Sequence, residues 1–300
     1  MRRLELCITQ ELAGIKVDTL LKRHLHLSGT VVRRIKWLPD GILVDGARVN
    51  TRFCPQEGQV LSVRLDDRSR RSGIVPAPGP LDILYEDGDM VVLNKAPGVS
   101  VHPGPGHFDD TLGNFLLDHY DREGETADFH PVHRLDRGTS GLLAAAKHPH
   151  AQEVLKNQLH TNAFRRTYLA VCEGIPQMPE GTIEAPLGPK PGSLMEQMVR
   201  PDGKFARTRY KVLGTYGGRA LVELELDTGR THQIRVHMAH LGHPLTGDFL
   251  YGREDRELIG RPALHSHRLE LNHPVTGERL TFTAPVPQDM EALMRSGKNF

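Results

Sequence analysis

The residues with the clearest capacity for chemistry lie in the segment 130–141, which reads HPVHRLDRGTSG and leads directly into the apolar stretch GLLAAA. Charged, hydroxyl and glycine residues placed this densely before a buried strand are costly unless each has a defined partner. Loops at strand ends are also where sites are commonly built. Asp136 lies between Arg134 and Arg137, and flanking cations favour the ionised carboxylate, so it could act as a nucleophile or a base. The same aspartate could instead serve only a turn or a salt bridge.

The elements that must position this segment follow from the pattern beyond Leu81. Short strands alternate there with a few helical stretches, which predicts an α+β domain with a largely antiparallel mixed sheet flanked by helices. Turns between strand pairs are too short for helical crossovers, which disfavours a doubly wound parallel sheet. Strands are expected at 90–95, 141–147, 165–171, 206–213 and 220–227, the last two joined across Gly217-Gly218, and helices at 150–159 and 232–241.

The N-terminal part predicts a separate small α/β unit. Helices are expected at 16–25 and 29–38, the second opened by Ser28, followed by strands with a hairpin turn at Asp45-Gly46. A segment rich in Arg, Gly and Pro then marks a linker. We therefore expect three parts, at residues 1–67, 68–80 and 81–300.

The charge is unevenly distributed between these parts. The formal net charge is +1, yet the first 75 residues hold 14 Lys and Arg against 8 Asp and Glu. A local excess of positive charge suggests a polyanionic partner, most commonly RNA or DNA. On charge alone, a solvated basic surface explains it equally well.

The composition excludes several classes of protein. Hydrophobic residues make up 38% of the chain, which is too many for wholesale disorder. No window approaches the roughly 18 to 20 apolar residues of a membrane span, and no apolar stretch follows the first arginines as in a signal peptide. Cys7, Cys54 and Cys172 are too far apart for a disulfide framework or a metal pair, so we expect buried, reduced thiols in a cytoplasmic protein.

Several blocks of the sequence agree with one known family. HRLDRGTSGLL closely resembles the signature of the RluA-type RNA pseudouridine synthases. Four further blocks agree in order and spacing: LNKAPGVSVHPGPG, RRTYLAV, TGRTHQIRVHMAHLGHPLTGD and LHSHRLELNHP. The resemblance covers roughly Leu81 to Pro285. The N-terminal part resembles the alpha-L (S-four-like) RNA-binding module, a common companion in this family, through Asp18-Thr-Leu-Leu, Leu27-Ser-Gly, the basic helix and Val44-Asp-Gly.

The resemblance implies an enzyme that isomerises uridines in RNA, with large-subunit ribosomal RNA favoured and transfer RNA as the alternative, acting as a cytoplasmic monomer. The reaction breaks the bond from ribose to N1, turns the uracil and rejoins it through C5. No atom enters or leaves and no electrons change hands, so no cofactor or metal ion is expected. The reaction needs a carboxylate, a dry pocket for the detached base and a group that removes the C5 proton.

The resemblance also assigns catalytic residues. Asp136 matches the conserved aspartate, Tyr168 the active-site tyrosine and Arg235 the ion-pair partner of that aspartate. Taken alone, Tyr168 would fit an ordinary core position. Thr231 is well placed to cap the helix that carries Arg235. Residue identity leaves open whether the carboxylate attacks the ribose, adds to the base or takes a proton from the sugar.

Contacts with the substrate follow from the same resemblance. Arg134 is expected to enter the space left by the flipped uridine, because an enzyme cannot reach the glycosidic bond of a stacked base. Ile234 is expected to pack against the base, and His133 and Thr139 to line its site. One departure from the family is Arg166, which stands where many members have lysine. In the N-terminal unit, phosphate contacts are expected from Arg33, Arg34 and Lys36.

Seventeen histidines raise the question of a metal site, above all His232, His237, His240 and His243. Their spacing does not match H-E-x-x-H and no cysteine lies near them in the sequence. We therefore expect packing, capping and RNA contact from them. The glycine-rich segment 102–107 lacks the Lys and Ser/Thr of a phosphate-binding loop and predicts a structured loop near the site.

Two other functions remain open. A non-catalytic RNA-binding or ribosome-assembly factor would explain the basic unit, but it has no need for Asp136, Tyr168 and Arg235 together. A hydrolase with an aspartate nucleophile would need a partner that activates water and usually a metal-binding D-x-D, and neither is evident in the sequence.

Overall fold

The apolar run that follows Asp136 forms strand β8 (Ser140–Ala146), in which every residue is buried. In the computed structural model, which describes residues 2–65, 70, 72–159 and 161–295, β8 lies inside a sheet of ten strands. Leu143 and Ala145 pack into a core on one face of that sheet, and Leu142 and Ala144 into a core on the other. A strand covered on both faces has a continuous apolar sequence, as observed here.

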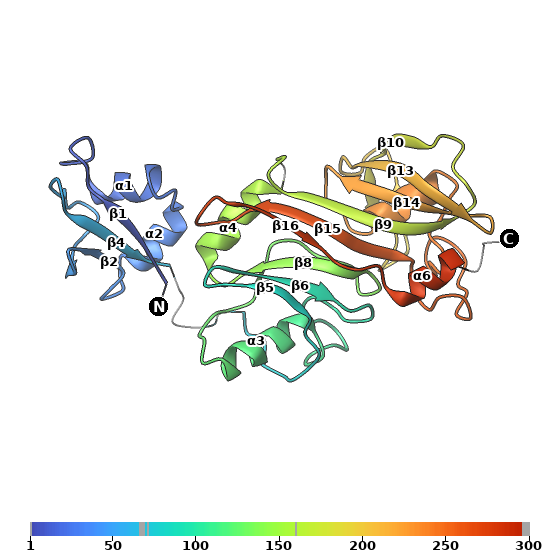
Figure 1. The fold of residues 1–300 in the computed structure, drawn as a ribbon, viewed down its shortest axis with the longest axis horizontal. Helices are drawn as coiled ribbons and strands as arrows, with labels where there is room; N and C mark the ends of the chain where they lie inside the picture. The colour runs from blue at the N-terminus through green and yellow to red at the C-terminus, as the bar shows by residue number, and fades with distance from the viewer. Residues whose placement is uncertain (1, 66–69, 71, 160, 296–300) are drawn as a thin grey trace.

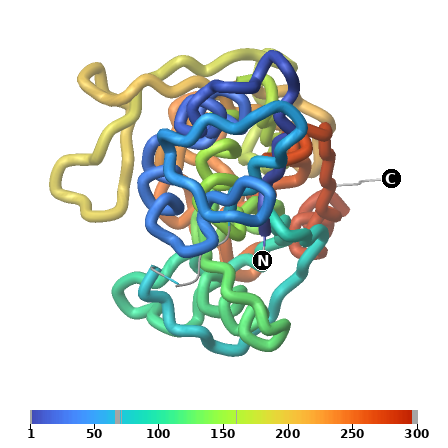
Figure 2. Tube along the Cα trace, turned by 90° about the vertical axis from the view of Figure 1, so that its left-hand side faces the viewer, coloured from blue at the N-terminus to red at the C-terminus, as the bar shows by residue number. Residues whose placement is uncertain are grey.

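The large sheet confirms the predicted α+β class and its largely antiparallel pairing (Figure 1). Strand β15 is antiparallel to β9 and parallel to β8. Along the sheet the order is β10 (Glu180–Glu184), β13 (Arg207–Tyr216), β14 (Arg219–Leu226), β9 (Arg165–Glu173), β15 (Leu264–Asn272), β8, β6 (Met90–Lys95) and β5 (Ile83–Glu86), with β16 (Arg279–Thr283) on β15 and β7 (His130–Pro131) on β8. A two-stranded hairpin of β11 (Leu187–Pro189) and β12 (Gln197–Val199) lies in the yellow segment that projects from the body in Figure 2.

Helices cover both faces of this sheet. Helices α3 (Leu112–Arg122) and α5 (Gln233–His240) supply residues to the core on one face, and α4 (Pro149–Gln158) packs on the opposite face. Helix α6 (Gln288–Arg295) forms a smaller cluster with residues of β9 and of the segment before β15. None of the helices in the described parts of the chain combines the length and the apolar character that a membrane span requires.

Several local predictions are confirmed and others are wrong. The turns at Asp45-Gly46 and Gly217-Gly218 have positive φ at both residues, as a tight hairpin turn needs. Thr231 does not cap α5: His232 precedes the helix in a left-handed conformation and makes no side-chain cap. The side-chain oxygen of Gln233 instead accepts the hydrogen bond from the backbone of residue 230.

The N-terminal unit forms a four-stranded antiparallel sheet with its own core, to the left in Figure 1. Ser28 accepts a hydrogen bond from the backbone of Val31, so it caps the second helix as predicted. The expectation of three buried cysteines is wrong, because Cys7 is exposed and Cys54 half-buried, and only Cys172 is buried. The elements are β1 (Arg3–Cys7), α1 (Val17–Arg23), α2 (Gly29–Ile35), β2 (Ile42–Val44), β3 (Ala47–Arg48) and β4 (Val60–Arg64).

The described residues of the expected linker make contacts with the larger unit. Residues 68, 69 and 71 of the segment 68–80 lie outside the described residues. Arg70 donates to the backbone oxygen of Ala127 at 3.0 Å and pairs with Asp121 at 2.7 Å. Ser72 donates through its backbone to Asp128 at 2.9 Å. The segment therefore packs along the larger unit.

A buried aspartate ties the two units together. Arg2 forms a bidentate ion pair with Asp89, with both distances 2.7 Å, and His148 lies 3.0 Å from the same carboxylate. Burial by itself raises the pKa of Asp89, but the hydrogen bonds from His148 and Arg2 lower it from 3.8 to about 2. A pKa lowered by folding means that the ionised form stabilises the folded state.

Replacing Asp89→Asn should therefore reduce the free energy of unfolding at pH 7 by about 2 kcal/mol. The contribution of Asp89 is present above about pH 4 and is lost as the pH falls towards 2, so the difference between variant and wild type should shrink in acid. Denaturant unfolding at pH 7 and pH 3 measures both quantities. Asp82→Asn, which changes an exposed carboxylate, is the control; equal stability of Asp89→Asn and wild type at pH 7 would contradict the assignment.

Candidate active site

A pocket of about 390 Å³ opens where the Asp136 segment, strand β9 and helix α5 meet. The lining includes all seven residues that the sequence assigned to catalysis or to substrate contact in the larger unit, although they come from three separated segments. These residues are Asp136, Tyr168, Arg235, Arg134, Ile234, His133 and Thr139.

The Asp136 segment is held from one side by a buried lysine. Lys95 ends β6, and its Nζ donates to the backbone oxygens of Ala96, Val99 and Arg137 at 2.8, 2.9 and 3.2 Å. The backbone of Gly98 donates to the same oxygen of Arg137 at 2.8 Å. Burial, together with the charge of Arg261, lowers the pKa of Lys95 to about 7. This lysine fixes the turn beside Asp136.

The other side of the segment is held by residues near β15. Arg261 donates to the backbone oxygen of Gly138 at 3.2 Å, and the hydroxyl of Ser140 lies 3.0 Å from Nδ1 of His265. Gly141 has a φ of +106°, and a Cβ there would lie 2.2 Å from the backbone oxygen of Ser266. Only glycine permits this close approach of β8 to β15, which accounts for the glycine at the end of the segment.

An arginine clamp orients the carboxylate of Asp136. Arg235 is buried, and its Nε and Nη2 each lie 2.7 Å from the carboxylate of Asp248, which is fully buried. The remaining nitrogen, Nη1, lies 3.7 Å from Oδ2 of Asp136. The expected pairing of Arg235 with Asp136 is thus present, but as the weaker contact of an arginine already fixed by Asp248.

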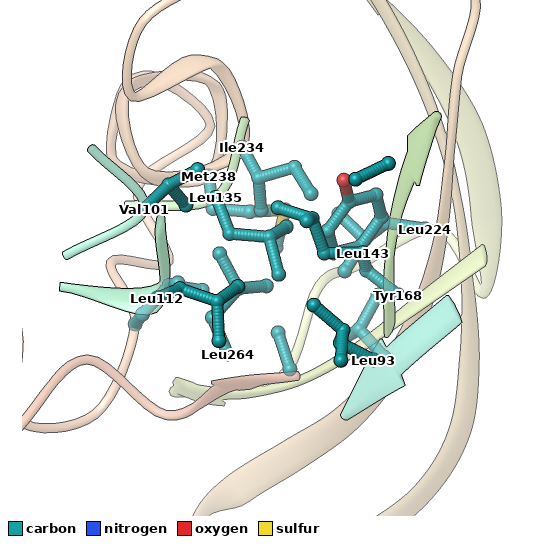
Figure 3. Close-up of a cluster of buried hydrophobic side chains, with 14 of the residues drawn as sticks. Leu93, Val101, Leu112, Leu135, Leu143, Tyr168, Leu224, Ile234, Met238 and Leu264 are labelled. Atoms are coloured by element: carbon teal, nitrogen blue, oxygen red, sulfur yellow. The ribbon is translucent and has the colours of Figure 1, made fainter. Parts of the chain in front are cut away.

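Apolar and aromatic side chains form the wall behind the carboxylate. Tyr168 and Ile234 are both buried and belong to the core cluster that also contains Leu135 and Leu264 (Figure 3). Burial raises the pKa of Tyr168, so the phenol stays protonated at neutral pH. The pocket therefore has an apolar wall, a neutral hydroxyl and a carboxylate.

The polar residues around the opening differ in exposure. Arg134 is exposed, whereas His133 and Thr139 are buried. Burial, together with the charge of Arg166, lowers the pKa of His133 to about 3, so this ring is neutral. Its Nε2 accepts a hydrogen bond from the backbone of Ala144 at 3.3 Å.

The three basic residues expected to contact RNA lie in the N-terminal unit and not at the pocket. Arg33 is exposed, whereas Arg34 and Lys36 are half-buried. Lys36 places its Nζ 4.9 Å from the ring of Trp37, which is 74% exposed. The predicted basic helix therefore presents one exposed cation, and it ends beside an exposed aromatic ring.

The histidines that raised the question of a metal site serve other contacts. His237 bonds Thr208 and the backbone oxygen of Ala185, and His243 the backbone of Glu173. Within the described ranges, the group that could hold a metal ion is Asp87, Asp89 and His273, which includes none of these four histidines. Its carboxylates are already occupied by Arg2, His148 and His273.

Two residues of the site did not emerge from the sequence, and His232 emerged only among the histidines considered for a metal site. Asp248 lies in the block that ends in PLTGD, so an acid was visible there, but nothing indicated that it would face Arg235. Lys95 lies in LNKAPG, within a second block that resembles the family. His232 places Nε2 4.0 Å from Oδ1 of Asp136 and Nδ1 2.8 Å from the hydroxyl of Tyr251.

Comparison with known proteins gives consistent matches. The family model described as RNA pseudouridylate synthase matches residues 89–240, which include Asp136, Tyr168 and Arg235. The structure of human RNA pseudouridylate synthase domain containing 1 superposes with a TM-score of 0.57 at 29% identity, over 69% of this chain and 85% of that one.

Relatives match over nearly the whole chain. The RNA pseudouridine synthase YjbO of Bacillus subtilis is 42% identical over 92% of this chain and 97% of its own. Ribosomal large subunit pseudouridine synthase D of Nitrosomonas europaea is 35% identical over 99% of this chain and 88% of its own. The chain therefore belongs to the RNA pseudouridine synthase family, in its RluA-type branch, and is an RNA pseudouridine synthase.

Proposed function

We propose that this enzyme converts uridines of large-subunit ribosomal RNA to pseudouridine, with the carboxylate of Asp136 as the group that acts on the nucleoside. The observation that carries the proposal is the placement of that carboxylate: it lies in a pocket beside Tyr168 and Ile234, and Arg235 faces it at 3.7 Å. The name of the Nitrosomonas europaea relative supports ribosomal RNA as the substrate.

The reaction explains why these groups would be combined. When the glycosidic bond breaks, the carboxylate of Asp136 can stabilise or bond the separated fragment, while Arg235 holds it in one orientation. The ring of Tyr168 and the side chain of Ile234 would hold the detached uracil as it turns. Because the phenol of Tyr168 is protonated, it can donate a hydrogen bond to a carbonyl oxygen of the base.

Entry of the uridine requires that it leave the RNA stack. Arg134 is exposed at the opening of the pocket, so its planar guanidinium is positioned to replace the stacking of the flipped base. His133 and Thr139 would complete the lining around the uracil.

Both units would bind the RNA substrate. We propose residues 1–67 as an alpha-L RNA-binding module, 68–80 as the connecting segment and 81–300 as the catalytic domain. Support comes from the separate core of the first unit and from the cations Arg33, Arg34 and Lys36, of which Lys36 lies over the ring of Trp37. The enzyme would act as a monomer in the cytoplasm.

Asp136→Asn keeps the size of the side chain but removes its charge and nucleophilicity. Conversion of uridine should fall by at least about 10⁴-fold, while the affinity for RNA changes less than about threefold. Pseudouridine is counted by mapping large-subunit ribosomal RNA from cells that carry the variant in place of the wild-type enzyme. Asp109→Asn, an exposed aspartate, should behave as wild type.

Normal levels of pseudouridine in the Asp136→Asn cells would contradict the mechanism. An absence of any modification by the wild-type enzyme in large-subunit ribosomal RNA would instead contradict the substrate, and transfer RNA from the same cells would then be mapped. If the Asp136→Asn cells lose uridine conversion, the protein acts as an enzyme and not as a non-catalytic assembly factor.

The role of the basic helix is tested by the variant Arg33→Met with Lys36→Met. If both residues contact phosphates, the slope of log affinity against log salt should fall by about 1.4 to 1.8. Binding of large-subunit ribosomal RNA between 50 and about 200 mM salt measures this slope. Arg256→Met with Arg295→Met removes two exposed cations elsewhere and serves as the control; an equal slope for wild type and the Arg33 variant would show that the helix is only solvated.

A further inference from the structure

Arg166 is a buried cation of β9 that lines the pocket. It is 7% exposed, and in the part of the chain that the structure describes its Nε has no hydrogen-bond partner. It lies on β9 two residues before Tyr168, so both side chains project from the same face of the sheet. Burying a charge is costly unless an opposite charge or several acceptors compensate it. Since no described residue accepts a hydrogen bond from its Nε, Arg166 could be compensated by an anion of the substrate.

The acids near this end of β9 are already engaged with other cations. Glu225 pairs with Arg165 at 3.1 Å. Asp227 pairs with Arg209 at 2.8 Å. Across the pocket, Asp136 is faced by Arg235 at 3.7 Å.

The lining of the pocket adds further positive charge around Arg166. Among the described residues that line it, Arg134, Arg166, Arg230 and Arg235 stand against the single carboxylate of Asp136. The ring of His133 is neutral, so it adds no further positive charge. An anionic group that entered the pocket would find an excess of cations there.

The backbone beside the guanidinium carries no side chain. Gly229 faces the guanidinium, and a Cβ there would lie 3.3 Å from Nη1 of Arg166. Arg166 also lines a second hollow of about 510 Å³, in which Arg165 and Arg209 lie. Arg166 thus lines both hollows, one of which holds Asp136.

We propose that Arg166 binds a phosphate group next to the target uridine and so holds the flipped nucleotide in the pocket. Arg166 and Tyr168 are separated by two residues of strand, or about 7 Å, which is comparable with the span from base to phosphate in one nucleotide. A planar guanidinium matches a phosphate through two parallel hydrogen bonds. The proposal rests on the proposed function, since it assumes that the flipped uridine reaches Tyr168. Arg166 is a substrate-positioning residue here, distinct from Arg134, which would replace the base in the stack.

The first test compares wild type, Arg166→Met and Arg166→Lys on a large-subunit ribosomal RNA transcript. Arg166→Met should lower kcat/KM by about 10- to 100-fold, and its salt slope should fall by about 0.7, the value of one phosphate contact to a single strand. Arg166→Lys should restore the salt slope but only part of kcat/KM, because lysine keeps the charge and loses the two-point contact. Arg219→Met removes another guanidinium of the same sheet, one paired with Glu173, and should leave the salt slope unchanged.

The second test uses a synthetic RNA in which the linkage on the 5′ or the 3′ side of the target uridine is a neutral methylphosphonate. One of these two RNAs should slow the wild type as much as Arg166→Met does, and should slow Arg166→Met no further. If the loss of rate caused by Arg166→Met and the loss caused by the methylphosphonate multiply for both RNAs, the proposal is overturned. An unchanged salt slope in Arg166→Met would also overturn it. Failure of the wild type to form pseudouridine would count against the proposed function, whereas the salt slope still tests Arg166 by binding alone.

Discussion

The buried ion pair between Arg235 and Asp248 is the interaction on which the arrangement of the site depends. Both groups are withdrawn from water, which costs free energy that only a well-matched geometry offsets. The match is bidentate, with two contacts of 2.7 Å. Because Asp248 holds two of the nitrogens of Arg235, the third faces Asp136 without having to be ordered when the substrate arrives. The ion pair thus holds the guanidinium of Arg235 in one fixed position.

The fold also holds in place the segment that carries Asp136. Lys95 from β6 and Arg261 from the approach to β15 bind the backbone oxygens of the two residues that follow the aspartate. The side-chain nitrogens of Lys95 and Arg261 bond backbone oxygens and not the carboxylate of Asp136. That carboxylate can therefore face the pocket. Tyr168 and Ile234 are set by the apolar core on the same face of the sheet. Distant parts of the sequence therefore converge because one sheet carries all of them.

Much of this was predictable from local pattern. The strand after Asp136, the helix of Arg235 and both tight turns follow from apolar spacing and turn residues. The seven residues that line one pocket were expected only from the family resemblance. The partner of Arg235 was not predictable, because an acid such as Asp248 pairs through tertiary contact that no spacing reports. The expected cap of α5 by Thr231 was wrong, because the helix begins after His232 in a left-handed conformation and has no side-chain cap. Cys7 was misjudged because it lies on the outward face of a strand that was not foreseen.

The most direct test of this account is a double-mutant cycle between Asp248 and Asp136. Asp248→Asn should lower kcat by about 10²-fold with little change in the affinity for RNA, since it releases Arg235 without removing the carboxylate. Combined with Asp136→Asn, it should cause no further loss, because an arginine that acts through Asp136 has nothing left to orient. An Asp248→Asn enzyme that folds and keeps the kcat of the wild type would contradict the account.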